Sequence, residues 1–163
     1  MHRLAASIGA LVIGVLTGVG PALAENAPPA PIVGVWQTPD KSQVTISPCP
    51  DGYCGILTHV GMAEASYAKL SAADKKRVDK QDPTIFPDVQ NQDPKLRTRS
   101  LVNLEMVTLK ATAKPGIFEG RLYNPQDGGT YDGNVRVESQ TQILLSGCLF
   151  KVLCRSQEWV RLK

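Results

Sequence analysis

The sequence predicts an all-β domain, an antiparallel barrel of about eight strands, with one short helix inside a long interruption. Three observations support this prediction. The chain has 163 residues, enough for one ordinary domain and too few for two sizeable ones. Eight segments are rich in β-branched and aromatic residues. Short turn-forming runs separate most of them, so neighbouring strands would pair as a meander, and eight strands suffice to close a small barrel.

The first 24 residues predict a secretory signal peptide. Arg3 gives a basic start, residues 4–19 are almost wholly apolar or small, and Ala22-Leu23-Ala24 forms an A-x-A cleavage pattern. The alternative is a retained membrane anchor, for which the apolar run is somewhat short and lacks a charged stop. We expect cleavage after Ala24 and a periplasmic mature protein with no transmembrane segment.

The mature chain begins with a proline-rich arm. Residues 25–31 (ENAPPAP) hold too many prolines for a regular helix or strand, so we expect an extended arm there. Residues 32–163 then form the single barrel domain.

The eight predicted strands share β-branched or aromatic residues and end at turn-forming residues. They span residues 32–36, 43–47, 53–60, 101–113, 117–123, 130–138, 142–148 and 152–162. In the 101–113 segment the side chains alternate, with Leu104 and Met106 on one face and Val107 and Leu109 on the other.

The interruption runs from Gly61 to Ser100. Within it, Ser71 to Asp74 resembles a capping box that opens a short helix through Val78. Residues 64–70 add another helical turn or so, and residues 81–96, with three prolines, form a long irregular loop. Loops of this length are uncommon in compact domains unless they are lids or disordered. We expect this segment to cover or border one barrel end.

The four cysteines predict two disulfides. In an exported protein an even number of cysteines at short spacings favours disulfides over thiol chemistry. Cys49 and Cys54 bracket one plausible turn, and Cys148 and Cys154 bracket another. Residues that flank such a loop face each other across the strands. We therefore favour these two local pairs over long-range pairing, each stabilising by about 2 kcal/mol.

Several blocks of sequence resemble a known family. Gly34-Val35-Trp36 resembles the G-x-W signature of lipocalin-like proteins. More specifically, the chain resembles the exported bacterial domain-of-unknown-function 2147 family over nearly all of its mature length. The blocks that carry this resemblance are residues 49–56, 91–99, 123–131 and 147–161, the last of which contains Cys154-Arg155-Ser156-Gln157-Glu158-Trp159.

The resemblance implies a lipocalin-like β-barrel in the periplasm, with no established activity and no catalytic residues. It also implies that a last-strand arginine, here Arg161, lies over Trp36, a contact that contributes about 0.5–2 kcal/mol, and that Trp159 is structural. Two departures stand out. Residues 61–90 are longer than the family usually shows, and Asn103 stands where glycine is expected.

Charge and motifs argue against several functions. The net charge is only +3, and no long basic run occurs, which disfavours a nucleic-acid partner. Once the signal peptide is removed, His59 is the only histidine, so multi-histidine metal sites are excluded. No nucleotide-binding loop or G-x-S-x-G motif is present, so we predict neither a cofactor nor a catalytic site.

A few polar residues remain as candidates for ligand contacts. His59 would lie at the barrel mouth, or else be an ordinary strand-end histidine. Arg97 and Arg99 would form a guanidinium pair for a carboxylate or phosphate if the segment is extended. Otherwise they are solvated or pair with Asp88 or Asp93.

Three tyrosines are further candidates for cavity contacts, although tyrosines on strands mostly pack against neighbours. They are Tyr53, Tyr123 and Tyr131.

The favoured function is non-catalytic binding of a small apolar or amphipathic molecule at one barrel end. The alternative is a structural or interaction module of the cell envelope whose barrel is filled by its own side chains, and a third class is a barrel enzyme. The size of the inward side chains distinguishes the first two classes. The strands contain both small and large residues, so the sequence leaves this choice open.

Overall fold

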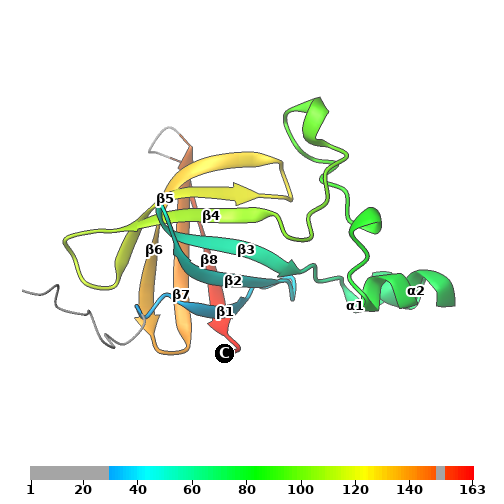
Figure 1. The fold of residues 1–163 in the computed structure, drawn as a ribbon, viewed down its shortest axis with the longest axis horizontal. Helices are drawn as coiled ribbons and strands as arrows, with labels where there is room; N and C mark the ends of the chain where they lie inside the picture. Colours follow the sequence, from blue (N-terminus) through cyan, green and yellow to red (C-terminus); the bar gives the residue numbers. More distant parts are fainter. Residues whose placement is uncertain (1–29, 150–152) are drawn as a thin grey trace, which may run out of the picture.

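The computed structural model describes residues 30–149 and 153–163, which form a closed barrel of eight antiparallel strands (Figure 1). Each strand pairs with the next along the chain, and the last closes on the first where Trp36 pairs with Arg161 and Gln37 with Val160. The predicted fold class and meander order are confirmed. The signal peptide and most of the proline-rich arm lie outside the described residues, so both remain predictions.

The strands share the alternating or β-rich patterns described above and follow each other through short turns, except between β3 and β4. They are β1 (Gly34–Gln37), β2 (Gln43–Cys49), β3 (Gly52–His59), β4 (Glu105–Ala111), β5 (Ile117–Asn124), β6 (Gly129–Ser139), β7 (Gln142–Leu149) and β8 (Leu153–Arg161). The β3–β4 connection carries α1 (Glu64–Ala68), α2 (Ala72–Asp79) and the 3₁₀ turns η1 (Pro83–Ile85) and η2 (Pro94–Leu96).

The two ends of the barrel differ. We call the end with the β2–β3, β4–β5 and β6–β7 turns the closed end, and the opposite end, where the long β3–β4 connection leaves the barrel, the open end. The closed half is filled by large apolar side chains, each at most 4% exposed: Trp36, Ile46, Leu109, Phe118, Val135 and Ile143.

The predicted contact between Trp36 and Arg161 is present. The guanidinium carbon lies 4.2 Å from the centroid of the indole ring. Arg161 also donates hydrogen bonds to the carbonyls of Val33 (2.7 Å), Gln140 (2.6 Å) and Pro31. The Arg161 side chain therefore links the first strand to the β6–β7 turn and to the segment before the barrel.

Strand β4 differs from its prediction in start and alternation. Residues 101–103 form a turn before the strand, in which Asn103 adopts a φ of 65°. That left-handed conformation favours glycine and tolerates asparagine, which accounts for asparagine at a position where glycine is expected. Met106 and Val107 are both buried because Met106 is the extra residue of a β-bulge, between the pairs Gly55–Val107 and Ile56–Glu105.

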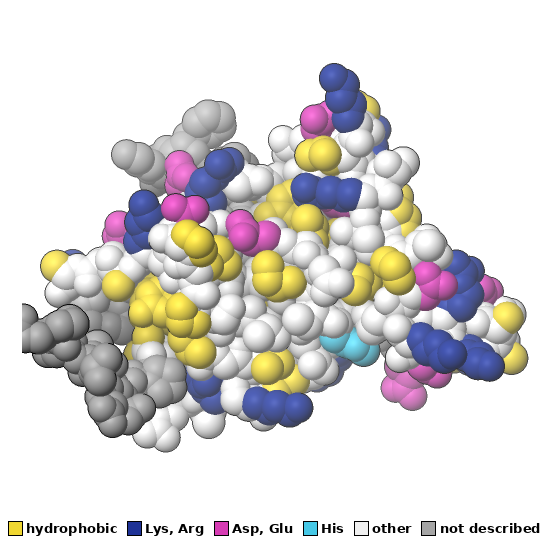
Figure 2. Space-filling model, in the orientation of Figure 1, with side chains coloured by type: hydrophobic (Ala, Val, Ile, Leu, Met, Phe, Trp, Pro, Cys, Tyr) yellow, Lys and Arg dark blue, Asp and Glu magenta, His cyan; other side chains and the backbone are white. Residues whose placement is uncertain are grey.

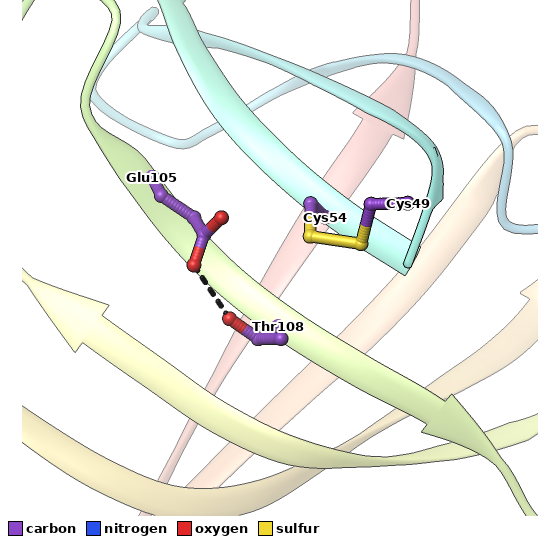
Figure 3. Close-up of a disulfide and its surroundings, with 4 residues drawn as sticks. All are labelled: Cys49, Cys54, Glu105 and Thr108. Carbon is purple, nitrogen blue, oxygen red and sulfur yellow. Dashed lines mark hydrogen bonds between the residues drawn. A yellow bond between two sulfur atoms is a disulfide. The ribbon is translucent and has the colours of Figure 1, made fainter. Parts of the chain in front are cut away.

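Both local disulfides are confirmed. Cys49 and Cys54 join across the β2–β3 turn at the closed end, where Figure 3 shows them beside β4 and the hydrogen bond from Thr108 to Glu105. Cys148 and Cys154 join β7 to β8 at the open end.

The β3–β4 connection projects from the open end (Figure 1), and we call residues 61–100 the excursion. The Ser71 hydroxyl accepts a hydrogen bond from the backbone N–H of Asp74, so the predicted cap and helix are confirmed. Figure 2 shows charged side chains of both signs over this part of the molecule. In residues 30–149 and 153–163, no helix is long and apolar enough to cross a membrane.

A buried carboxylate attaches the excursion to the barrel. Asp88 is only 1% exposed and accepts hydrogen bonds from the Tyr123 hydroxyl (2.6 Å), Asn91 Nδ2 (2.9 Å) and Arg99 Nε (2.9 Å). Tyr123 lies on β5, whereas the other three residues belong to the excursion. This cluster fixes the far part of the excursion beside the open end.

Candidate functional site

The open end of the barrel contains a cavity of about 750 Å³. This volume falls within the range of small-molecule sites in proteins. Its walls come from the inner faces of the strands, and its rim comes from the β1–β2 and β5–β6 connections and from Val60 and Leu101, which flank the excursion. The barrel interior is therefore filled at one end and hollow at the other.

The floor of the cavity is apolar. Five buried side chains from five different strands form it, and none is more than 8% exposed: Leu57, Val107, Leu122, Leu145 and Trp159. A ligand placed against them would be largely removed from water, which favours an apolar group at this depth.

Two glycines on the wall leave room for the side chains around them. Gly133 on β6 pairs with Gly147 on β7. A Cβ atom on Gly133 would lie 2.8 Å from Leu122 Cδ1, and one on Gly147 would lie 3.2 Å from Tyr131 Cβ. At Gly133 the Ser146 carbonyl oxygen would lie closer still, so glycine at both positions lets the neighbouring strand and side chains pack closely along this wall.

The rim carries two carboxylates that the chain's own donors satisfy. Asp40 accepts hydrogen bonds from the hydroxyls of Thr38 and Ser42, the latter at 3.1 Å. These three residues belong to the β1–β2 connection and line the cavity.

The second rim carboxylate is Asp127 in the β5–β6 turn. It accepts hydrogen bonds from Asn124 Nδ2 (2.8 Å), the backbone N–H of Gly129 (2.9 Å) and the Tyr131 hydroxyl (2.9 Å). The bond to Asp127 raises the pKa of Tyr131, because it stabilises the protonated phenol, and burial adds to the increase. The positive charge of Arg155 acts in the opposite direction on this pKa.

Strand β8 presents alternate side chains to the cavity. Arg155, Gln157 and Trp159 lie on the face of β8 that points inward, and Cys154 and Ser156 also border the cavity near the mouth. The Trp159 indole N–H donates to Gln157 Oε1 at 2.7 Å. Strand β8 thus extends from the apolar floor at Trp159 to the charged mouth at Arg155.

Of the predicted ligand contacts, Tyr131 and Tyr123 line the cavity. Tyr53 instead packs edge-to-face on Phe118, with the ring centroids 5.3 Å apart, in the closed half. His59 is a half-buried residue at the end of β3 and does not line the cavity.

The two arginines of the excursion do not act as a pair. Residues 94–99 form a 3₁₀ turn and a further turn rather than an extended segment, so side chains two apart do not point the same way. Arg97 donates to the Asn91 carbonyl, and Arg99 forms an ion pair with Asp88, the alternative that the sequence had left open. Neither lines the cavity.

Sequence reasoning did not identify Arg155, Gln157 or Asp127 as cavity residues. The first two stand in the alternating run Arg155-x-Gln157-x-Trp159, which places all three on one face of a strand. That pattern was visible in the sequence, but which face points inward depends on the closed barrel. Asp127 lies in the turn between β5 and β6, and its local sequence does not indicate that it borders a cavity.

A closed eight-stranded antiparallel barrel with an apolar cavity at one end is the architecture of lipocalin-like proteins. Among solved structures, the chain is similar to protein HP1028 from the human pathogen Helicobacter pylori, which is described as belonging to the lipocalin family. The TM-score is 0.56 at 20% identity, over 80% of this chain and 82% of that one. This likeness shows the fold.

The chain belongs to the family described as an uncharacterized protein conserved in bacteria (DUF2147), whose model matches residues 34–161. The family resemblance predicted from the sequence is therefore confirmed. A search of curated proteins finds no match.

Proposed function

We propose that this protein binds one small apolar or amphipathic molecule in the open-end cavity and does not transform it chemically. The observation that supports this proposal is the cavity of about 750 Å³ with an apolar floor and a polar rim. An apolar body would lie against Leu57, Leu122 and Trp159, while a polar group stays near water at the mouth, because burying it without partners is costly.

The side chains around the cavity favour binding over catalysis. Among the described residues, those that line the cavity include no histidine and no free thiol, since Cys154 is in a disulfide. The rim carboxylates Asp40 and Asp127 are held by hydrogen bonds from the chain itself. The lipocalin-like fold is consistent with a ligand-binding role.

The binding test compares two tryptophan substitutions on adjacent residues of β8. Gln157 lines the cavity, so Gln157→Trp would fill part of it, whereas Glu158 is an exposed neighbour outside the cavity lining and Glu158→Trp serves as the control. We expect native mass spectrometry of protein from its own cell envelope to show a bound small molecule. A fluorescent fatty-acid probe should bind to the wild type and to Glu158→Trp, but only weakly to Gln157→Trp.

The absence of both a co-purifying molecule and probe binding in the wild type would reject this function. It would favour an interaction role for the outer surface of the barrel instead. Equal probe binding by the two variants would place the ligand outside the cavity.

We also propose that the protein acts in the periplasm. The two disulfides are consistent with an oxidising compartment, and the first 24 residues have the features of a signal peptide. N-terminal sequencing of protein from the envelope fraction should begin at Glu25. A chain that begins at Met1 would contradict this prediction.

A further inference from the structure

Arg155 is the basic side chain of the cavity. Among the described residues that line the cavity, it is the only lysine, arginine or histidine. Its side chain is exposed at the mouth, two inward positions above Trp159 on the same strand. At about 3.3 Å per residue, these two side chains are separated by roughly 13 Å along β8.

Tyr131 forms the wall beside Arg155. Arg155 pairs in register with Gly147, which contributes no side chain to the wall. On the other side of Gly147 lies Tyr131, whose Cβ is 3.2 Å from the position that a Cβ on Gly147 would occupy. The absent side chain lets Tyr131 pack over Gly147, and both Arg155 and Tyr131 line the cavity here.

The rim carboxylates do not accept hydrogen bonds from the Arg155 guanidinium. Within residues 30–149 and 153–163, Arg155 forms no ion pair or side-chain hydrogen bond. Asp40 and Asp127 instead receive hydroxyl, amide and backbone donors. A guanidinium in this setting can present two parallel N–H groups to one planar or tetrahedral anion.

We infer that the cavity selects ligands with an anionic head group, a carboxylate or a phosphate, and that Arg155 binds this head group at the mouth of the cavity. This inference rests on the proposed function and specifies its ligand class. The anion stays at the mouth near water, and the apolar body extends along β8 toward Trp159. The head-group site thus lies on the inner wall of the barrel and not in the excursion.

The test compares acidic and neutral probes of the same chain length. A fluorescent fatty acid, its methyl ester and the corresponding alkyl phosphate are titrated into wild type, Arg155→Met and Arg155→Lys. Arg121→Met, at an exposed arginine of β5 outside the cavity lining, is the matched control. Circular dichroism confirms that each variant is folded.

We expect Arg155→Met to weaken binding of the carboxylate or the phosphate probe by about tenfold or more, since a charge-assisted hydrogen-bond pair is lost. Binding of the ester should stay unchanged. Arg155→Lys should recover part of the loss, and Arg121→Met should match the wild type. The two acidic probes together reveal which anion Arg155 prefers.

Two results would overturn the inference in distinguishable ways. Wild-type protein that binds none of the three probes would reject the proposed function as well. Wild-type protein that binds acid and ester alike, or an Arg155→Met variant that binds the acidic probes normally, would reject the role of Arg155 and leave apolar binding intact.

Discussion

At the scale of single residues, the Arg161 side chain makes a cation–π contact and several hydrogen bonds at once. It lies on the indole of Trp36 and donates to three backbone carbonyls near the closed end. Arg136, by contrast, lies on the barrel surface and pairs with Glu138, with more than half of its side chain exposed.

We predict that Arg161→Ala lowers the free energy of unfolding by about 2–3 kcal/mol, because a cation–π contact and charge-assisted hydrogen bonds are lost together. Arg136→Ala should change it by less than about 1 kcal/mol, as exposed ion pairs contribute little. Urea denaturation monitored by tryptophan fluorescence measures both. Equal effects of the two substitutions would contradict the structural role of Arg161.

Asp82, which caps the 3₁₀ turn η1, gives a prediction about pH. Hydrogen bonds from the Thr84 hydroxyl, the Thr84 backbone N–H and Arg77 lower the pKa of Asp82 from 3.8 to about 2. A lowered carboxyl pKa stabilises the folded state above the unfolded pKa, and this contribution is lost as the pH falls from about 4 toward 2. NMR titration should show Thr84→Ala raising this pKa more than Arg77→Ala does.

At the scale of elements, the excursion is attached to the barrel mainly where Asp88 meets Tyr123. Additional contacts support it: the backbone N–H of Leu101 donates to the Phe86 carbonyl, and Gln81 bonds with the backbone of Val60. The barrel itself closes through its own strand pairs, none of which involves the excursion.

We predict that Asp88→Ala loosens the excursion while the barrel stays folded. The substitution leaves the donors of Tyr123, Asn91 and Arg99 without their acceptor, a loss of about 3 kcal/mol or more for such a buried cluster. Hydrogen exchange should accelerate in residues 83–100 and remain slow in β6–β8. Asp93→Asn, at an exposed cap, serves as the control, and uniform acceleration across the barrel would contradict this view.

At the scale of the whole molecule, the two disulfides reinforce opposite ends of the barrel. Cys49–Cys54 lies at the closed end, and Cys148–Cys154 joins the strands that border the cavity, with Cys154 in its lining. Both close short loops, so the chain-entropy model assigns about 2 kcal/mol to each.

We predict that replacing either pair by alanines lowers the free energy of unfolding by about this amount without unfolding the protein. Only the double variant Cys148→Ala/Cys154→Ala should also weaken probe binding. This variant lacks the link between β7 and β8, and β8 carries Arg155. Urea denaturation and probe titration test this. If loss of the Cys49–Cys54 link weakened binding equally, the proposed separation of the two ends would be wrong.

Local chemistry alone was enough to predict the strands, the capped helix and the two disulfides. Period-two patterns and turn residues act over a few neighbouring positions, and each cysteine pair brackets its own turn. The contact between Trp36 and Arg161 followed from the family resemblance, because it joins the two ends of the chain.

The cavity and the partners of the charged residues depended on tertiary structure. Asp88 meets Tyr123 across 35 residues, and the bulge at Met106 exists only where β3 and β4 pair. The closure of the eight strands into a barrel decides whether Arg155 points inward and whether side chains fill the interior. Alternation indicates which side chains share a face, but only the closed barrel decides how much volume those side chains leave empty.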